Sequence, residues 1–279
     1  MTPITKGERI YLGAVALLAA WVGAFCYFDT NLADVGIPWR VAPLCAGFLG
    51  AMYLSGAVFN GACMLARRWT DVRVIMPMIV MWTGGLLIIS LFFLPAFNFA
   101  RLQVWIWFSA YLIYPLIALS LIWRHRAQRG EHPAGEPPLP RPARSYLLAQ
   151  GASMIALGLC LLLAPRAMGP IWPWQTGRLM LQIYSAPLLS YGIGSLILAR
   201  QRAWSEIRLA LAAIGVFTGG ALVASVRFSY LLNGPVPAVA AWLTWLTVAT
   251  LALAALSVQA WRAARPARVS ASFAAAAAN

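Results

Sequence analysis

The sequence offers few side chains that could do acid–base or metal chemistry. Its only two histidines, His125 and His132, lie outside the long apolar segments, and no aspartate or glutamate falls inside one. Haem ligation by paired histidines and the H-E-x-x-H pattern of zinc peptidases are therefore excluded, and a proton relay has no buried carboxylate to use. We predict no catalytic residue, no metal site and no cofactor; bound lipid remains an option.

The cysteines do not change this interpretation, because none of the four belongs to a C-x-x-C pair. Cys26 and Cys45 fall toward the same end of the apolar segments, so a disulfide between them is one hypothesis. Buried apolar filler is the other hypothesis, and the simpler one.

Arg227 is the charged residue placed deepest in an apolar segment. A lone arginine in lipid costs several kcal/mol, so it must snorkel, pair or face a wet cavity. One hypothesis is that Arg227 pairs with Asp29 or Asp34, which follow the first long apolar segment and are expected on the outer side of the membrane. The other is that several arginines form an outer vestibule that attracts a carboxylate or phosphate. The candidate residues of this vestibule are Arg227, Arg178, Arg40, Arg101, Asp29 and Asp34.

Two Thr-Gly-Gly motifs lie near the middle of predicted spans. Their residues are Thr83, Gly84 and Gly85, and Thr218, Gly219 and Gly220. Glycine lets helices approach closely and threonine can bond across the contact, so the motifs predict tight packing of the third and seventh spans or a polar pocket at the axis between two halves. Uncharged polarity comes from Asn60, Gln150, Gln182, Tyr53, Tyr184 and Tyr191. These residue types favour a neutral or lipid-like solute, or one bound only at the outer rim.

Two short loops share a tryptophan, an acid and an arginine at matching spacing. They contain Trp69, Asp71 and Arg73 in one case and Trp204, Glu206 and Arg208 in the other. Each acid precedes the next helix, where the helix dipole favours negative charge. The loops are interpreted as inner latches in which the acids pair with neighbouring arginines, or as a docking site for a cytoplasmic partner.

Long apolar segments position these residues. The chain has 279 residues, of which 62% are hydrophobic and 10% charged, and its mean hydropathy is +0.75. A spanning helix needs about 20 mostly apolar residues, and an open sheet in lipid would leave backbone groups unpaired. The predicted spans are 10–28, 41–66, 74–97, 102–123, 146–164, 179–199, 209–232 and 236–261. The sequence therefore predicts an all-α membrane protein.

Charge asymmetry orients these spans. If the N-terminus is cytoplasmic, most of the 21 basic residues fall on the cytoplasmic side, as positive charge prefers. We expect a multi-pass protein of the bacterial cytoplasmic (inner) membrane with both termini cytoplasmic. The net charge of +14 then reflects topogenic arginines, and no nucleic-acid partner is predicted. All tryptophans except Trp21 and Trp82 fall at a predicted membrane boundary.

The two halves of the chain resemble each other in an ordered series of short motifs. Tyr11-Leu12-x-Ala14 pairs with Tyr146-Leu147-x-Ala149, Gly36-x-x-Trp39 with Gly169-x-x-Trp172, and Trp69-Thr70-Asp71-Val72-Arg73 with Trp204-Ser205-Glu206-Ile207-Arg208. Each half has an even number of spans, so the copies point the same way. The predicted organisation is a first four-helix repeat over 1–123, a Pro/Arg-rich cytoplasmic linker over 124–145, a second repeat over 146–262 and a low-complexity tail over 263–279.

Residues 40–125 carry a resemblance to known sequences. The strings Gly50-Ala51-Met52-Tyr53-Leu54, Pro77-Met78-Ile79 with Trp82-Thr83-Gly84, Val104-Trp105-Ile106-Trp107-Phe108, and Tyr114-Pro115-Leu116-Ile117-Ala118-Leu119 resemble an uncharacterised group of predicted bacterial multi-pass integral membrane proteins. That group has no known activity. The resemblance supports the fold class and implies nothing about function.

The fold class predicted from the sequence is an all-α membrane protein of eight transmembrane helices in two tandem, same-orientation four-helix repeats. We expect a non-enzymatic protein that handles a small neutral or lipid-like solute, because duplication creates an axial cavity between the halves. The alternatives are a non-catalytic subunit that scaffolds a larger membrane complex, and an enzyme at the outer headgroup layer. A polar path along the axis between the two halves would favour transport, whereas an axis without polar groups or water would favour a structural subunit. The expected partners are the lipid bilayer and either other membrane subunits or further copies of the chain.

Overall fold

The computed structural model describes residues 3–128 and 138–276, which fold as an all-α bundle. Eight of its helices are long and apolar enough to cross a membrane. They are α1 (Lys6–Phe28), α3 (Pro43–Leu65), α4 (Ile75–Phe92), α5 (Leu102–Arg124), α6 (Arg141–Leu163), α8 (Arg178–Ala199), α9 (Trp204–Arg227) and α10 (Val236–Ala276). Two single-turn helices, α2 (Ala33–Gly36) and α7 (Pro165–Met168), lie in the connections that follow α1 and α6. The protein is a polytopic membrane protein.

Each predicted span corresponds to one of these helices, but several helix ends differ from the prediction. Helix α1 starts at Lys6 because Thr5 and Glu8 form a capping box, with the Glu8 amide donating to Thr5 Oγ1 at 3.3 Å and the Thr5 amide donating to Glu8 Oε2 at 2.8 Å. Helix α6 starts within the predicted linker, where Pro142 fits the first helical turn. Helix α10 continues through the predicted tail as far as Ala276. The linker residues 129–137, which include His132, and residues 277–279 lie outside the described part of the chain.

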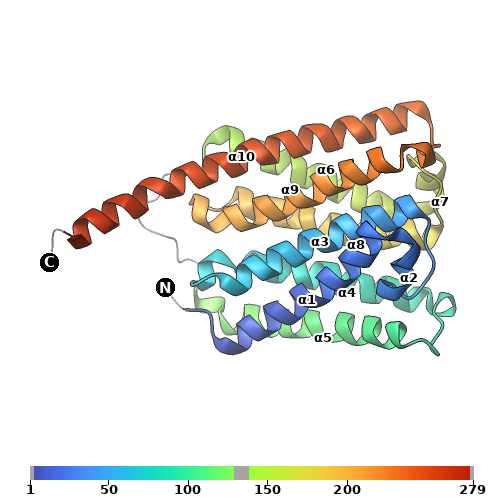
Figure 1. Ribbon diagram of the computed structural model, residues 1–279, viewed down its shortest axis with the longest axis horizontal. Helices are drawn as coiled ribbons and strands as arrows, with labels where there is room; N and C mark the ends of the chain where they lie inside the picture. Colours follow the sequence, from blue (N-terminus) through green and yellow to red (C-terminus); the bar gives the residue numbers. More distant parts are fainter. Residues whose placement is uncertain (1–2, 129–137, 277–279) are drawn as a thin grey trace.

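The long helices form two rows that face each other. Neighbours in one row are α1, α3, α9 and α10, and neighbours in the other are α5, α4, α8 and α6. Figure 1 shows the long helices lying side by side, with α10 at one edge of the bundle and α5 at the other. The start of α1 and the end of α10 lie at the same end of the bundle, and α2 and α7 lie at the opposite end. Helices α3, α4, α8 and α9 are therefore central.

Two of the hydrogen bonds between the central helices form a matched pair. Ser55 Oγ in α3 donates to the carbonyl oxygen of Ala213 in α9 at 2.6 Å, and Ser190 Oγ in α8 donates to that of Met78 in α4 at 2.8 Å. The number of residues that separates Ser55 from Ser190 also separates Met78 from Ala213. The donor belongs to the first half of the chain in one bond and to the second half in the other. Each bond joins the first half of the chain to the second. A hydroxyl buried in the apolar interior of the bundle needs such a partner.

Small residues form a second matched pair of contacts between the halves. A Cβ placed on Gly85 in α4 would lie 3.1 Å from the Cβ of Ala186 in α8, and one placed on Gly220 in α9 would lie 3.0 Å from that of Ala51 in α3. The offset is the one that separates Ser55 from Ser190. Glycine and alanine thus allow α4 to approach α8, and α9 to approach α3, closely enough for dense packing.

Candidate functional site

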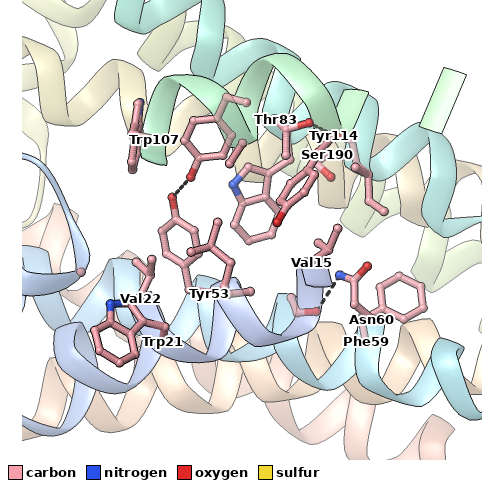
Figure 2. Close-up of a pocket in the computed structure, with 18 of the residues that line it drawn as sticks. Val15, Trp21, Val22, Tyr53, Phe59, Asn60, Thr83, Trp107, Tyr114 and Ser190 are labelled. Carbon is pink, nitrogen blue, oxygen red and sulfur yellow. Dashed lines mark hydrogen bonds between the residues drawn. The ribbon is translucent and has the colours of Figure 1, made fainter. Parts of the chain in front are cut away.

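A pocket of about 110 Å³ lies within the first half of the chain, between α1, α3, α4 and α5. Ser190 and Tyr191 of α8 complete its wall. Figure 2 shows Val15 and Asn60 toward one end of the pocket and Trp21 and Val22 toward the other. An apolar cavity of about 150 Å³ in a protein core can hold a benzene molecule, so this volume suits a single ring or a short alkyl segment.

The pocket opens to the surface of the bundle between α1 and α5. Trp21 of α1 and Ile106 of α5 line the pocket and are 52% and 44% exposed, on the part of the surface that faces lipid. Nearer the start of α1, the two helices are tied together: Tyr11 Oη donates to the carbonyl oxygen of Tyr114 at 2.9 Å, and Tyr114 Oη donates to that of Ala14 at 3.4 Å. The two exposed lining residues therefore lie on the side of this tie that is nearer the end of α1.

Helical spacing places the polar lining residues on one face of each helix. Tyr53, Gly56 and Asn60 follow one another on α3 at i, i+3 and i+7, and Trp107 and Tyr111 are four residues apart on α5. Residues with these spacings share a helix face. The faces of α3 and α5 that carry these residues both line the pocket.

Asn60 provides an unpaired acceptor in this pocket. Its side-chain Nδ2 donates to the carbonyl oxygen of Gly56 at 2.8 Å, which fixes the orientation of the amide. Oδ1 is buried and has no hydrogen-bond partner among the described residues, and Asn60 as a whole is 5% exposed. Buried polar atoms are usually paired in proteins, so this oxygen remains available to accept a hydrogen bond.

Two tyrosines and a tryptophan add hydrogen-bond donors. The hydroxyls of Tyr53 and Tyr111 are bonded to each other, and both residues are buried. Each hydroxyl carries one proton, so only one of the two protons is used in this bond and the other can be donated elsewhere. Within the described part of the chain, the indole N–H of Trp82, which also lines the pocket, makes no hydrogen bond. The pocket therefore combines a mainly apolar lining with hydrogen-bond donors at some positions and an acceptor, Asn60 Oδ1, at another.

Most of the predicted outer vestibule is not assembled. Arg101 pairs with Asp34 at 3.6 Å and donates to the Asp34 carbonyl oxygen at 2.7 Å. Arg178 lies over the ring of Phe93, with 5.6 Å from Cζ to the ring centroid. Among the described residues, no ion pair or hydrogen bond joins Arg178 or the exposed Arg40 to another vestibule residue, and the side chain of Asp29 accepts from the amide of Asn31. No convergent anion site is formed by these contacts.

The position of Arg227 corrects the prediction that it lies inside a span covering 209–232. It is the last residue of α9 and is exposed, so no charge is buried in the middle of a helix. Its Nη1 donates to the carbonyl oxygen of Tyr27 at 3.1 Å, and its Cζ lies 5.0 Å from the centroid of the Phe228 ring. Arg227 thus ties the end of α9 to the end of α1 without pairing with Asp29 or Asp34.

The Thr-Gly-Gly motifs make packing contacts, and one of them also reaches the pocket. Thr83 lines the pocket, but its hydroxyl already donates to the carbonyl oxygen of Ile79 at 2.6 Å. Thr218 donates to the carbonyl oxygen of Gly215 at 3.3 Å. Gly85 and Gly220 face the other half of the chain as described above. A Cβ placed on Gly84 would lie 3.8 Å from that of Pro115 in α5, and one placed on Gly219 would lie 3.5 Å from Cγ2 of Thr250 in α10.

The inner loops are joined across the two halves of the chain. Arg73 Nη2 lies 2.5 Å from Glu206 Oε1 and 2.8 Å from Gln201 Oε1, and the Glu206 side chain is fully buried. Glu206 Oε2 also accepts from the amides of Arg202 and Ala203 at the start of α9. Asp71 pairs with Arg68 of its own loop at 3.4 Å. The latch at Glu206 therefore connects the halves instead of closing one loop.

His125 forms a buried pair that the sequence did not predict. It caps the end of α5 and is 5% exposed, with Nε2 2.7 Å from Glu8 Oε1 and Nδ1 3.1 Å from Gln128 Oε1. Both ring nitrogens therefore lie within hydrogen-bonding distance of a side-chain oxygen. The ring of Trp69 stacks on His125 at 3.9 Å between centroids. The sequence placed Glu8 and His125 outside the predicted spans, at positions 117 residues apart, so only the packing of α1 against α5 reveals this contact.

Several residues of the pocket had a signal in the sequence. Trp21 and Trp82 are the tryptophans that fall outside the predicted aromatic belts, and both line the pocket. Asn60, Tyr53 and Tyr191 were among the predicted sources of uncharged polarity. Tyr111 had no such signal, because it lies within a continuous apolar segment.

Searches against protein-family models, curated proteins and solved structures find no match. The resemblance of residues 40–125 to predicted bacterial membrane proteins therefore assigns no family. Within residues 3–128 and 138–276, no cluster of three or more His, Cys, Asp or Glu side chains could hold a metal ion, and Cys26, Cys45, Cys63 and Cys160 are free.

Proposed function

We propose that this polytopic membrane protein binds a small neutral or lipid-like solute in the pocket of its first half and moves it within or across the bilayer. The observation that carries the proposal is a pocket with an opening between α1 and α5 on the surface that faces lipid. Its 24 lining residues include no Asp, Glu, Lys, Arg or His. An uncharged site that opens sideways suits a solute that partitions into the membrane.

We also propose that the chain is a tandem duplication, with the four helices α1, α3, α4 and α5 repeated in the same orientation as α6, α8, α9 and α10. Matched contacts support this. Besides the pairs at Ser55 and Ser190, Trp107 Nε1 donates to Ser90 Oγ at 2.9 Å, and Trp242 Nε1 donates to Ser225 Oγ at 3.1 Å. One offset relates every pair. The same offset relates two isolated β-bridges near the starts of α1 and α6, one between Pro3 and Arg68 and the other between Pro138 and Ala203.

The membrane and the orientation belong to the same proposal. The distribution of arginines favours the bacterial cytoplasmic membrane, with both ends of the chain in the cytoplasm. The start of α1 and the end of α10 at one end of the bundle are compatible with this orientation (Figure 1). Labelling of single cysteines introduced near each end, with a reagent that cannot cross the membrane, tests it: labelling in intact cells would reverse the assignment.

The interface between the halves favours a path through the side of the bundle over one along its axis. Phe48, Tyr184, Tyr191 and Phe217 are each at most 1% exposed, and their rings fill the space between the central helices. The cavity expected on the axis is thus replaced by packed aromatic side chains, and the pocket lies to one side. This filled interface is also what favours the second candidate function, a non-catalytic subunit that stabilises a larger membrane complex.

Purification from native membranes separates the two functions. We expect native mass spectrometry to find one neutral, lipid-like molecule per chain, and vesicles that contain the protein to exchange that molecule faster than empty vesicles. Gly56→Leu should abolish both, because a side chain there would extend from α3 toward the ring of Trp82. Gly61→Leu on the same helix is the control, since no atom lies within 4 Å of its Cβ position. Stoichiometric co-purified proteins with no bound molecule would support the subunit function instead.

A further inference from the structure

We infer that the pocket recognises a molecule with a hydroxyl or N–H donor on an apolar body, and that Asn60 Oδ1 receives this donor. The inference rests on the proposed function only in treating the pocket as a solute site. It goes further by naming the chemical class of the solute and the residue that selects it.

Asn60 Oδ1 is a buried acceptor in the pocket wall that has no partner among the described residues. Asn60 cannot turn its amide to satisfy Oδ1, because Nδ2 is held by the carbonyl oxygen of Gly56 at 2.8 Å. An acceptor buried without a partner is unfavourable, and it becomes more so in an apolar surrounding. A ligand that donates a hydrogen bond removes this cost, whereas a ligand without a donor leaves it in place.

Further points in the pocket fit the same class of molecule. The hydroxyl pair of Tyr53 and Tyr111 has one proton left to donate, and the indole N–H of Trp82 has no hydrogen-bond partner in residues 3–128 and 138–276. A carbonyl, ether or second hydroxyl oxygen in the ligand can accept from either donor. Most of the remaining lining is aliphatic or aromatic, and Thr83, Gln103 and Ser190 add polar side chains. The hydroxyl or N–H group of the ligand is thus expected at the end of the pocket near Asn60, and its apolar part against the aromatic side chains of the lining.

The second half of the chain does not repeat these polar groups. At the offset between Ser55 and Ser190, the counterparts of Asn60, Tyr53, Trp82, Tyr111 and Gly56 are respectively Ser195, Leu188, Phe217, Leu246 and Tyr191. Ser195 is already bonded, because Gln150 Nε2 donates to its Oγ at 3.4 Å. Tyr191 fills the interior where the first half has a glycine. The polar groups assigned to the ligand therefore occur in the first half of the chain alone, among the described residues.

The test compares two matched probes in lipid nanodiscs. One is a fatty alcohol that carries a diazirine near its hydroxyl end, and the other is its methyl ether, which cannot donate a hydrogen bond. After illumination, mass spectrometry locates the labelled peptides and measures how labelling saturates. We expect the alcohol to label pocket residues of α1, α4 and α5 and to half-saturate at a concentration about tenfold below that of the ether.

Variants assign this preference to Asn60. Asn60→Leu should bind alcohol and ether equally. Asn60→Ala, which also removes the acceptor, should give the same result if the leucine variant does not fold. Gln182→Leu is the matched control, because Gln182 Oε1 is also buried and unpaired but lies outside the pocket. Equal binding of the two probes to the wild type, or a preference that survives at Asn60→Leu, would overturn the inference.

Competition identifies the source of the donor. If phenol displaces the labelled alcohol and hexadecanol does not, the ligand is a small aromatic alcohol; the reverse result indicates a lipid alcohol, and both results support the class. The outcome is independent of transport. A protein that prefers the alcohol yet exchanges nothing between vesicles would refute the proposed function and leave the binding site intact.

Discussion

The crossing of α1 and α3 depends on a glycine whose replacement by alanine should destabilise the bundle. A Cβ placed on Gly50 would lie 2.7 Å from the backbone nitrogen of Tyr27 and 2.7 Å from its Cβ. An ordinary contact between such atoms is about 3.5 Å, so the two helices would have to separate by about 0.8 Å. The obstacle is mainly backbone, which cannot move aside as the end of a flexible side chain can.

The magnitude follows from a comparison within one helix. Gly61 is also in α3, and a Cβ there meets no atom within 4 Å. Both substitutions to alanine gain the same helix propensity, about 1 kcal/mol, so this contribution cancels when the two variants are compared. What remains is the cost of overpacking at Gly50, typically about 1–3 kcal/mol.

The assay is reversible unfolding in mixed micelles with increasing sodium dodecyl sulfate, followed by far-ultraviolet circular dichroism. We expect the free energy of unfolding of Gly50→Ala to be about 1–3 kcal/mol below that of Gly61→Ala, a large fraction of the stability of a typical domain. If the two variants unfold within about 0.5 kcal/mol of each other, a value ordinary for substitutions that disturb no contact, the close approach of α1 and α3 at Gly50 is refuted.

The same unfolding assay checks three charged contacts. Arg73→Ala should cost about 3–5 kcal/mol, because the fully buried Glu206 carboxylate loses a partner from the other half; an unchanged unfolding curve would show that this pair does not hold the halves together. His125→Leu should cost a similar amount by leaving the Glu8 carboxylate buried without the imidazole, and Glu8→Gln in that background should recover part of the loss, which independent effects would not do. Arg101→Ala should cost at most about 1 kcal/mol, since its ion pair is partly exposed, and a greater loss would indicate a larger structural role.

How far the sequence predicts the fold differs between helix cores and helix ends. The core of every span was predictable, because an apolar stretch of sufficient length has no other stable place than the hydrocarbon. The ends were less predictable, because polar residues prolong a helix when they cap it. Glu8 does this for α1 with Thr5, and Glu206 does it for α9 with the amides of Arg202 and Ala203.

The candidate site was predictable only in part. Trp21 and Trp82 stood out in the sequence because an indole away from the membrane boundary needs another reason to be there. Asn60 was visible as polarity within a span. That its acceptor is unpaired was not visible, because this depends on the orientation of the amide set by Gly56 and on the absence of a donor among neighbouring described residues.

The sequence by itself determined that the chain crosses a membrane through eight apolar helices and that their interior is almost free of ionisable groups, since both follow from composition and segment length. Tertiary structure alone decided that Glu206 reaches Arg73, that His125 meets Glu8, and that the pocket lies on one side of the bundle instead of on its axis. These contacts join residues far apart in the chain. Whether a space remains open or is filled depends on which side chains meet there, and no local pattern in a sequence contains that information.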